Sequence, residues 1–232
     1  IEPMNHARKF TGRANVTISP SDKLDVAVNT GYINSDTKIA VENGGLWFNL
    51  IFHNPSANSP GPAAPLGVTG QRRGFWSAPP EIQYLNREVS QLLKKTTVGV
   101  TLNHRPNSVL SWKVTAGQDQ SSTDDLAFRV NTPELTPFFG ATAALGSRII
   151  ARNNVQTTTF DVSASARVPV NESVTSITTV GAQYFSKLAT FQSSIGNRFP
   201  APDLEVVNAA EERLGTEDFV ENNTLGVFVQ QQ

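Results

Sequence analysis

Alternation of hydrophobic and polar residues is the strongest pattern in this chain. In residues 13–19, for example, Ala14, Val16 and Ile18 alternate with Asn15 and Thr17. Successive side chains of a β-strand point to opposite faces, so a period of two predicts a strand with one aliphatic and one polar face. The pattern returns in six further segments, residues 24–32, 97–103, 110–117, 160–167, 174–185 and 225–230, with Phe228 as an exception in the last. The sequence therefore predicts seven strands.

The connections between these segments alternate in length. Three are short and rich in Pro, Asn, Asp and Ser, at residues 19–23, 105–108 and 168–172. Such residues form the tight turns that join antiparallel strands. The other three connections are long, at about residues 34–95, 120–147 and 186–221. Short turns at one end of a sheet and long loops at the other are typical of an outer-membrane β-barrel.

Composition excludes several other classes. The 232 residues include 19 Lys and Arg against 20 Asp and Glu, which lacks the basic excess of a general nucleic-acid binder. The chain has no cysteine, so it has no disulfide framework, thiolate metal site or cysteine nucleophile. It also has no run of about 18 apolar residues of the kind that forms a transmembrane helix. Predicted strands of about ten residues match the span of a tilted transmembrane strand.

The chemistry of the two strand faces favours a sheet in contact with lipid. The polar face carries mostly Thr, Ser, Asn, Gln and Gly with few charges, which suits a water-filled interior, and the small aliphatic face suits hydrocarbon. In lipid all backbone polar groups must be paired internally, so a sheet has to close. Trp112, Tyr32 and Tyr184 are candidates for the aromatic girdles of such a barrel. A soluble β-sandwich remains the alternative, because its strands also alternate.

The long connections carry local patterns of their own. Residues 81–95 place Ile82, Leu85, Val89, Leu92 and Leu93 at helical spacing after two prolines, which predicts a short amphipathic helix. Residues 203–214 are expected to form one or two further helical turns. Residues 54–67 are rich in Pro, Gly and Ser and predict an irregular loop.

Four short segments resemble TonB-dependent outer-membrane receptors, specifically the SusC/RagA-like branch. They are Thr11-Gly12-Arg13-Ala14-Asn15, leading to Leu24-Asp25-Val26; Gln71-Arg72-Arg73-Gly74-Phe75; Phe199-Pro200-Ala201-Pro202-Asp203-Leu204; and Glu221-Asn222-Asn223-Thr224-Leu225-Gly226-Val227-Phe228-Val229-Gln230. The third segment departs from the family pattern at Asp203, where Gly is usual. The resemblance spans nearly the whole chain and depends on the order of the segments rather than on any catalytic motif.

The resemblance implies an antiparallel up-and-down transmembrane β-barrel, of which residues 1–232 form one part. Family barrels have about 22 strands, so seven strands cannot close one. We expect the signal peptide, the plug domain and the C-terminal strands to lie outside this segment. The implied function is active uptake of a nutrient across the bacterial outer membrane, with an oligosaccharide or peptide favoured over a siderophore or vitamin. The implied partners are the TonB complex, acting through the plug, and a surface lipoprotein of the SusD type.

No catalytic or metal site is predicted. His6, His53 and His104 are far apart and show no ligand spacing, and the adjacent carboxylates Asp124-Asp125 and Glu211-Glu212 are interpreted as solvated surface. We expect no cofactor and no enzymatic activity. Ser163 and Ser165 lie on a polar strand face, where hydroxyls hydrate a lumen.

The first long loop contains the candidate substrate-binding residues. They combine aromatic rings, which stack on sugars and apolar groups, with arginines, which bind carboxylates and phosphates through two parallel hydrogen bonds. These residues are Trp47, Phe48, Arg72, Arg73, Phe75 and Trp76. Packing of the loop against itself or against the barrel wall is the alternative explanation for them.

Two other functions remain open at this point. A passive porin or an adhesin barrel would have the same rhythm of hairpins. A secreted β-sandwich that binds carbohydrate would have the same alternation.

Overall fold

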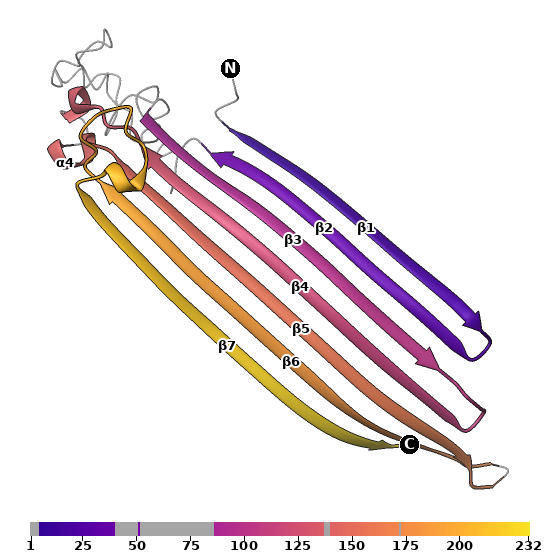
Figure 1. Ribbon diagram of the computed structural model, residues 1–232. Coiled ribbons are helices and arrows are strands. Elements are labelled where there is room, and N and C mark those ends of the chain that lie inside the picture. The colour runs from indigo at the N-terminus through magenta and orange to yellow at the C-terminus, as the bar shows by residue number, and fades with distance from the viewer. Residues whose placement is uncertain (1–4, 40–50, 52–85, 137–139, 172) are drawn as a thin grey trace.

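Seven long strands form one antiparallel sheet, in the order in which they occur in the chain (Figure 1). The structure is a computed structural model that describes residues 5–39, 51, 86–136, 140–171 and 173–232. The strands are β1 (His6–Ser21), β2 (Leu24–Ile39), β3 (Arg87–His104), β4 (Leu110–Arg129), β5 (Ser147–Pro169), β6 (Thr175–Asn197) and β7 (Glu212–Gln231). The predicted all-β, up-and-down arrangement is confirmed.

The three predicted tight turns join β1 to β2, β3 to β4 and β5 to β6 at one end of the sheet, called here the turn end. Asn107 explains one of them, since its side-chain oxygen accepts hydrogen bonds from the backbone N–H groups of Val109 (2.9 Å) and Leu110 (2.8 Å). This local bonding is the reason why Asn favours turns. The longer connections lie at the opposite end, called the loop end (Figure 1).

The strands are longer than the predicted ten residues, at 16 to 23 residues each. They continue into segments that the sequence assigns to loops, so that β6 runs on to Asn197. Strand β3 corrects the helix predicted for residues 81–95, because residues 87–95 belong to this strand; Ile82 and Leu85 lie outside the described residues. Hydrogen bonds to β2 on one side and to β4 on the other override the helical spacing.

Short helices occur only between strands in the described part of the chain. Those whose bounds are described are the 3-10 turn η1 (Pro133–Leu135), helix α4 (Ala141–Ala144) and the 3-10 turn η2 (Val207–Ala209). Residues 203–214, predicted as helical, contain the single turn η2 and then enter β7 at Glu212. No helix of the described residues is both long and apolar enough to cross a membrane.

The register of the strands collects the aliphatic residues on one face of the sheet. Directly paired residues form a row across all seven strands: Ile18, Val26, Leu102, Val114, Val162, Ala182 and Val227. The next row on this face is Val16, Val28, Val100, Ala116, Phe160, Tyr184 and Leu225. Between these two rows, the opposite face presents Thr17, Ala27, Thr101, Thr115, Asp161, Gln183 and Gly226.

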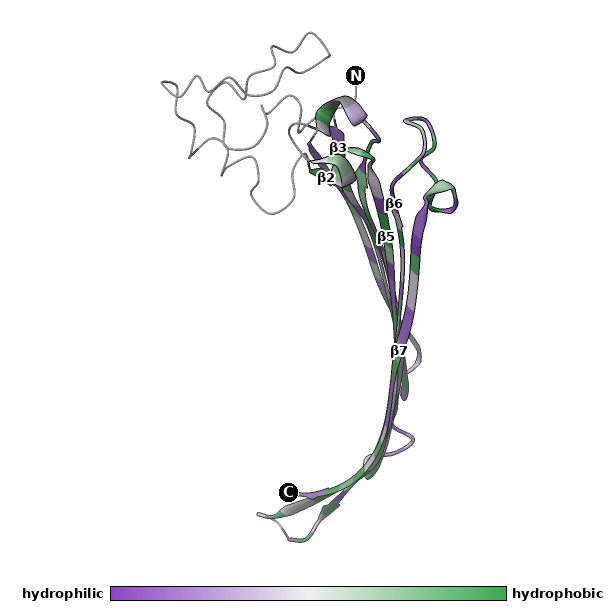
Figure 2. Cartoon of the chain, turned by 90° about the vertical axis from the view of Figure 1, so that its left-hand side faces the viewer, coloured by the Kyte–Doolittle hydropathy of each residue, from purple (hydrophilic) through white to green (hydrophobic). Residues whose placement is uncertain are grey.

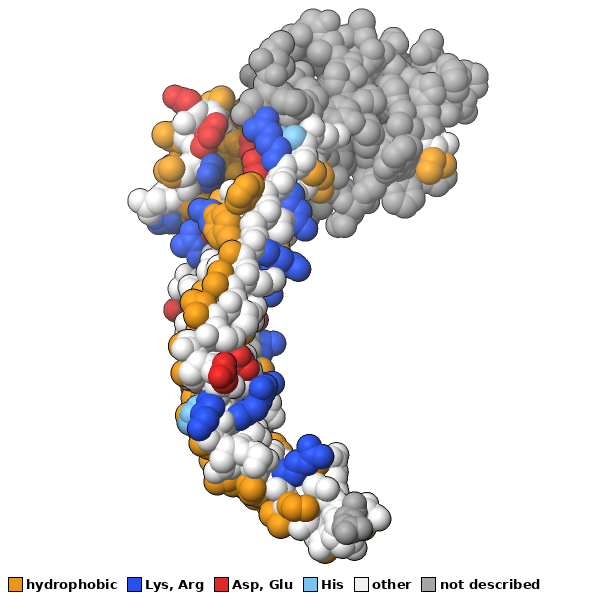
Figure 3. All heavy atoms as spheres, turned by 90° about the vertical axis from the view of Figure 1, so that its right-hand side faces the viewer, with side chains coloured by type: hydrophobic (Ala, Val, Ile, Leu, Met, Phe, Trp, Pro, Cys, Tyr) orange, Lys and Arg blue, Asp and Glu red, His pale blue; other side chains and the backbone are white. Residues whose placement is uncertain are grey.

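The sheet is a single layer that bows along its strands (Figure 2). Hydrophobic side chains follow its convex border, whereas Lys and Arg side chains gather on the concave side of its middle part (Figure 3). The aliphatic rows therefore lie on the convex face. Their side chains are exposed on the edge strands, with 55% of Ile18 and 81% of Val227 accessible, and exposed or half-buried on the inner strands. Among the described residues no second layer covers this face, which is unlike a β-sandwich.

The buried hydrophobic side chains of the described residues all lie at the loop end. They are Leu135, Ala144, Phe199 and Ala210, and Phe199 is the largest side chain that is fully buried. We call the segments that contain them, residues 130–136, 140–146 and 198–211, the rim. The ring of Phe199 meets the ring of Phe128 edge-on, with centroids 6.4 Å apart. The motif that begins at Phe199 thus anchors the connection between β6 and β7.

Backbone and amide hydrogen bonds hold the rim together. Phe199 donates its N–H to the carbonyl of Leu145 (2.9 Å), and its own carbonyl accepts a hydrogen bond from the buried Asn131 side chain. Gly146, which follows Leu145, has a φ of 81°. A Cβ on Gly146 would lie 2.7 Å from the Arg129 carbonyl oxygen. Only glycine fits this conformation and this space. The rim is therefore a small packed unit at the ends of the strands.

Replacing Phe199 by Ala should loosen the rim selectively. Loss of a fully buried phenylalanine costs about 3–5 kcal/mol, and the loss falls on the connection that this ring anchors. Hydrogen exchange measured by mass spectrometry on the intact protein should show faster exchange in residues 198–211 and unchanged exchange in the centres of β4 and β5. Phe10→Ala is the matched control, since Phe10 is 64% exposed on β1. Equal protection of residues 198–211 in both variants would contradict the anchoring role of Phe199.

Candidate functional site

The concave face is the candidate functional surface of the described residues. The six residues predicted to bind substrate, Trp47, Phe48, Arg72, Arg73, Phe75 and Trp76, all lie outside the described residues. The described part of this surface therefore consists of strand residues. It presents hydroxyl, amide and charged side chains in rows that alternate along each strand with the convex rows.

Hydrogen bonds between neighbouring strands organise this concave wall. Asp119 on β4 accepts a hydrogen bond from the Thr97 hydroxyl on β3 and pairs with the ammonium group of Lys95 at 3.4 Å. Nearer the turn end, the hydroxyls of Ser165 and Thr179 lie 2.8 Å apart. Ser165 thus contacts a hydroxyl of the neighbouring strand on the polar face.

Phe228, which breaks the alternation of the seventh segment, points to the concave side and lies over Gly181 of β6. A Cβ on Gly181 would come within 2.5 Å of the Phe228 ring and 2.8 Å of the Val162 carbonyl oxygen. Glycine at this position makes room for the ring, and the ring covers the backbone that glycine leaves bare. Phe228, the exception to the alternation, is therefore explained by its cross-strand pairing with Gly181.

One concave row near the loop end is aliphatic, which the sequence analysis missed. Its paired residues are Ile39, Val89, Ala127, Ile149, Ile195 and Leu214. Part of this row lines a hollow of about 430 Å³, together with Gln91 and Asp125, whose side chains share a hydrogen bond of 2.8 Å. The alternation of apolar and polar residues does not reveal this row, because the row lies near the loop end, where charged side chains also occur on the convex face.

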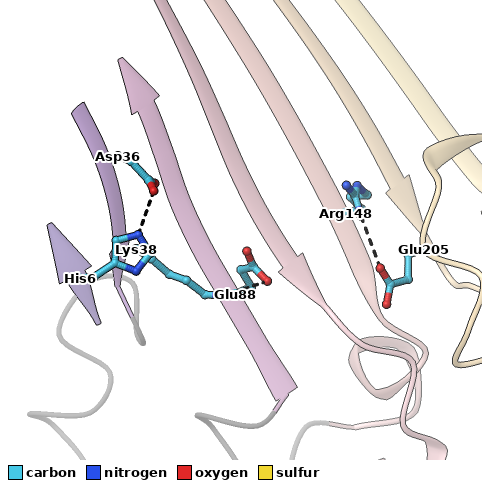
Figure 4. Close-up of polar contacts among 6 residues, drawn as sticks. All are labelled: His6, Asp36, Lys38, Glu88, Arg148 and Glu205. Carbon is cyan, nitrogen blue, oxygen red and sulfur yellow. Dashed lines mark hydrogen bonds and ion pairs between the residues drawn. The ribbon is translucent and has the colours of Figure 1, made fainter. Parts of the chain in front are cut away.

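Two ion pairs and a histidine–carboxylate hydrogen bond occupy the convex face near the loop end (Figure 4). His6 lies 3.1 Å from Asp36, Lys38 lies 3.2 Å from Glu88, and Arg148 reaches Glu205 of the rim at 4.0 Å. Each of these contacts is at least partly exposed, so each contributes little to stability. They mark the level at which the convex face changes from aliphatic to charged.

Among the described residues, those considered for acid–base chemistry or metal binding do not form such a site; His53 lies outside the described residues. Asp124 faces Arg152 on the convex side, whereas Asp125 bonds Gln91 on the concave side, so these neighbours point apart. Glu211 and Glu212, expected to be simply solvated, both pair with Arg198, at 2.8 and 3.1 Å. Within the described ranges no group of three or more His, Asp or Glu side chains could hold a metal ion.

Comparison with solved structures gives the fold. The chain matches the structure of the RagAB peptide transporter with a TM-score of 0.75 at 16% sequence identity, covering 98% of this chain and 26% of that one. It also matches the RagAB peptide importer in its closed-closed state (TM-score 0.73, 15% identity) and in its open-open state (TM-score 0.74, 16% identity), with the same coverage.

No protein-family model and no curated protein matches the chain. The chain spans about a quarter of the length of the transporter chains that it matches. At this level of identity the likeness shows the fold alone, and the seven strands therefore have the fold of one part of a peptide-transporter chain.

Proposed function

We propose that this chain forms part of the β-barrel wall of a TonB-dependent outer-membrane importer of the SusC/RagA-like branch. The observation that carries the proposal is the opposite chemistry of the two faces. Two complete rows of the convex face contain no charged side chain, and no second layer of described residues covers them. The row between them on the concave face is mostly polar. The aliphatic convex face suits contact with hydrocarbon, and the polar concave face suits a water-filled lumen.

The dimensions of the aliphatic zone support contact with a bilayer. On β2 the convex face runs from Leu24 to Tyr32, nine residues that extend about 27 Å along the strand. At a tilt of about 40° this is about 20 Å along the barrel axis, near the height of an outer-membrane apolar band. Trp112 contacts His104 at the turn-end border, with ring centroids 5.0 Å apart, and Tyr32 meets Phe10 at the other border, with centroids 6.3 Å apart. Trp112 and Tyr32 are thus suited to the two interfacial girdles.

Further strands complete the barrel in this proposal. Among the described residues β1 and β7 each pair on one side only, and an unpaired strand edge is not tolerated in hydrocarbon. The loop end, where the rim lies, faces the cell exterior, and the turn end faces the periplasm. This orientation places the rim where a surface lipoprotein of the SusD type would dock.

Import of peptides is the favoured activity, because the matched structures are those of a peptide transporter and importer. The strand wall offers hydroxyls, amides and scattered charges that a peptide can pass without tight binding. The TonB complex would supply the energy by acting on a plug within the same receptor. The mechanism requires no bond in the cargo to be made or broken.

Arginine at adjacent positions of β5 should separate the two faces. Val162 belongs to an aliphatic convex row and Ser163 to the concave face. Val162→Arg places a charge in the apolar band, where the cost near the bilayer midplane is about 2–4 kcal/mol. Ser163→Arg places the same charge in the water-filled lumen, where substitutions alter selectivity rather than stability, and should cost much less. Urea unfolding of the intact receptor in phospholipid vesicles measures the difference.

The control is urea unfolding of the intact protein and of the same two variants in buffer without detergent or lipid. A soluble sandwich would bury Val162 in a dry core and fold in water without detergent or lipid. If the intact protein folds in buffer alone, and only Val162→Arg destabilises it there, its convex face packs in a dry core and does not contact lipid.

Uptake of a labelled peptide tests the function itself. Cells that carry the intact receptor should accumulate a peptide of five to ten residues faster than cells without it, and loss of TonB should reduce the rate to background. A labelled oligosaccharide of similar size serves as the comparison cargo. Uptake that persists without TonB would identify a passive channel, and uptake of the sugar alone would replace peptide as the substrate.

A further inference from the structure

A hollow in the concave wall lies among β1, β2 and β3, away from the rim. Its volume is about 240 Å³, and the concave side chains that line it are Arg13, Asn15, Asn29, Ile33, Lys95 and Thr97. Gly31 also lines the hollow, directly opposite Arg13 on one side and Thr97 on the other. Because Gly31 has no side chain, the space between the Arg13 and Thr97 side chains stays open.

The charges around this hollow are unequal. Lys95 pairs with Asp119 at 3.4 Å, and the same carboxylate accepts a hydrogen bond from Thr97. Arg13 is exposed, and no described residue offers it a hydrogen bond or an ion pair. Lys95 is thus paired with a carboxylate, whereas the guanidinium of Arg13 is available to bind another acceptor.

The remaining lining groups add hydrogen-bonding capacity. Asn15 and Asn29 are directly opposite each other in the register, and both border the hollow. An amide side chain can donate and accept hydrogen bonds, and a guanidinium presents two parallel N–H groups that match the two oxygens of a carboxylate. The Arg13 guanidinium and the Asn15 and Asn29 amides thus surround the same open hollow.

We infer that this hollow binds a carboxylate group of the imported peptide, with Arg13 as the principal contact. The inference rests on the proposed function and adds a binding site on the barrel wall to it. The carboxylate would come from the C-terminus of the peptide or from an acidic side chain. An exposed guanidinium in a wet lumen binds weakly, which suits a wall that holds cargo briefly and then releases it.

Binding of matched peptides to the intact receptor in detergent tests the site. The first probe is a peptide without charged side chains, as the free acid and as the C-terminal amide. Isothermal titration should give the acid an affinity about two- to five-fold higher than the amide. A third probe, the amide carrying one glutamate, should recover the higher affinity if side-chain carboxylates are accepted, and should bind like the plain amide if only the C-terminus is read.

Substitutions at the site should remove the preference for the acid. Arg13→Gln should lower the affinity for the acid to that for the amide, and Arg13→Lys should keep part of the difference because it keeps the charge without the planar fork. Gly31→Val should give the same loss while Arg13 stays in place, since a Cβ at Gly31 meets Thr97 and Arg13 only at 3.8 and 3.9 Å and the added methyl groups enter the hollow. Arg8→Gln is the matched control on the convex side of the same strand and should change neither affinity.

The outcomes separate the site from the function. If Arg13→Gln and Gly31→Val fold normally and still prefer the acid as the natural receptor does, the site is refuted while peptide import stands. If the natural receptor binds and imports none of the peptides, the proposed function fails and the site loses its ligand.

Discussion

The ladder of backbone hydrogen bonds across seven strands is the interaction on which the rest of the structure depends. Each strand pairs with the next along nearly its whole length, from the turn end to the loop end. The buried hydrophobic side chains of the described residues belong to the rim, so they do not hold the body of the sheet together. In hydrocarbon an unpaired N–H or C=O costs several kcal/mol. A bilayer that surrounds the aliphatic face therefore also requires every backbone N–H and C=O of the sheet to be paired.

The register of this ladder determines what each face can do. A shift by one residue would move Val162 to the concave side and Asp161 to the convex side, which reverses the chemistry of both faces. Tight turns such as the one stabilised by Asn107 hold the register at the turn end. The same register places Gly31 beside Arg13 and Phe228 over Gly181. Turn chemistry, strand pairing and the chemistry of the concave face thus depend on one another.

The sequence predicted the features that a period of two reveals. It identified seven strands, their antiparallel order and the three tight turns, because those stretches have one aliphatic and one polar face. It missed the loop-end halves of the strands, where a convex row contains Asp36, Leu92, Asp124 and Arg152 and resembles a loop. The helix predicted for residues 81–95 was wrong over residues 87–95 for the same reason, since Leu92 and Leu93 lie on opposite faces of β3. The hollow beside Arg13 depends on three strands in register, which spacing along one segment cannot reveal.

Collision of a spin label with oxygen and with a water-soluble nickel chelate measures the central claim most directly. A nitroxide placed in turn at residues 158–168 of β5, in the intact receptor in vesicles, samples both faces of one strand. Labels on the convex face (even positions) should collide mainly with oxygen, which concentrates in the bilayer, and labels on the concave face (odd positions) mainly with the chelate. If the even positions instead meet the chelate freely, or are shielded from both reagents as in a dry protein core, the convex face does not border lipid and the account is contradicted.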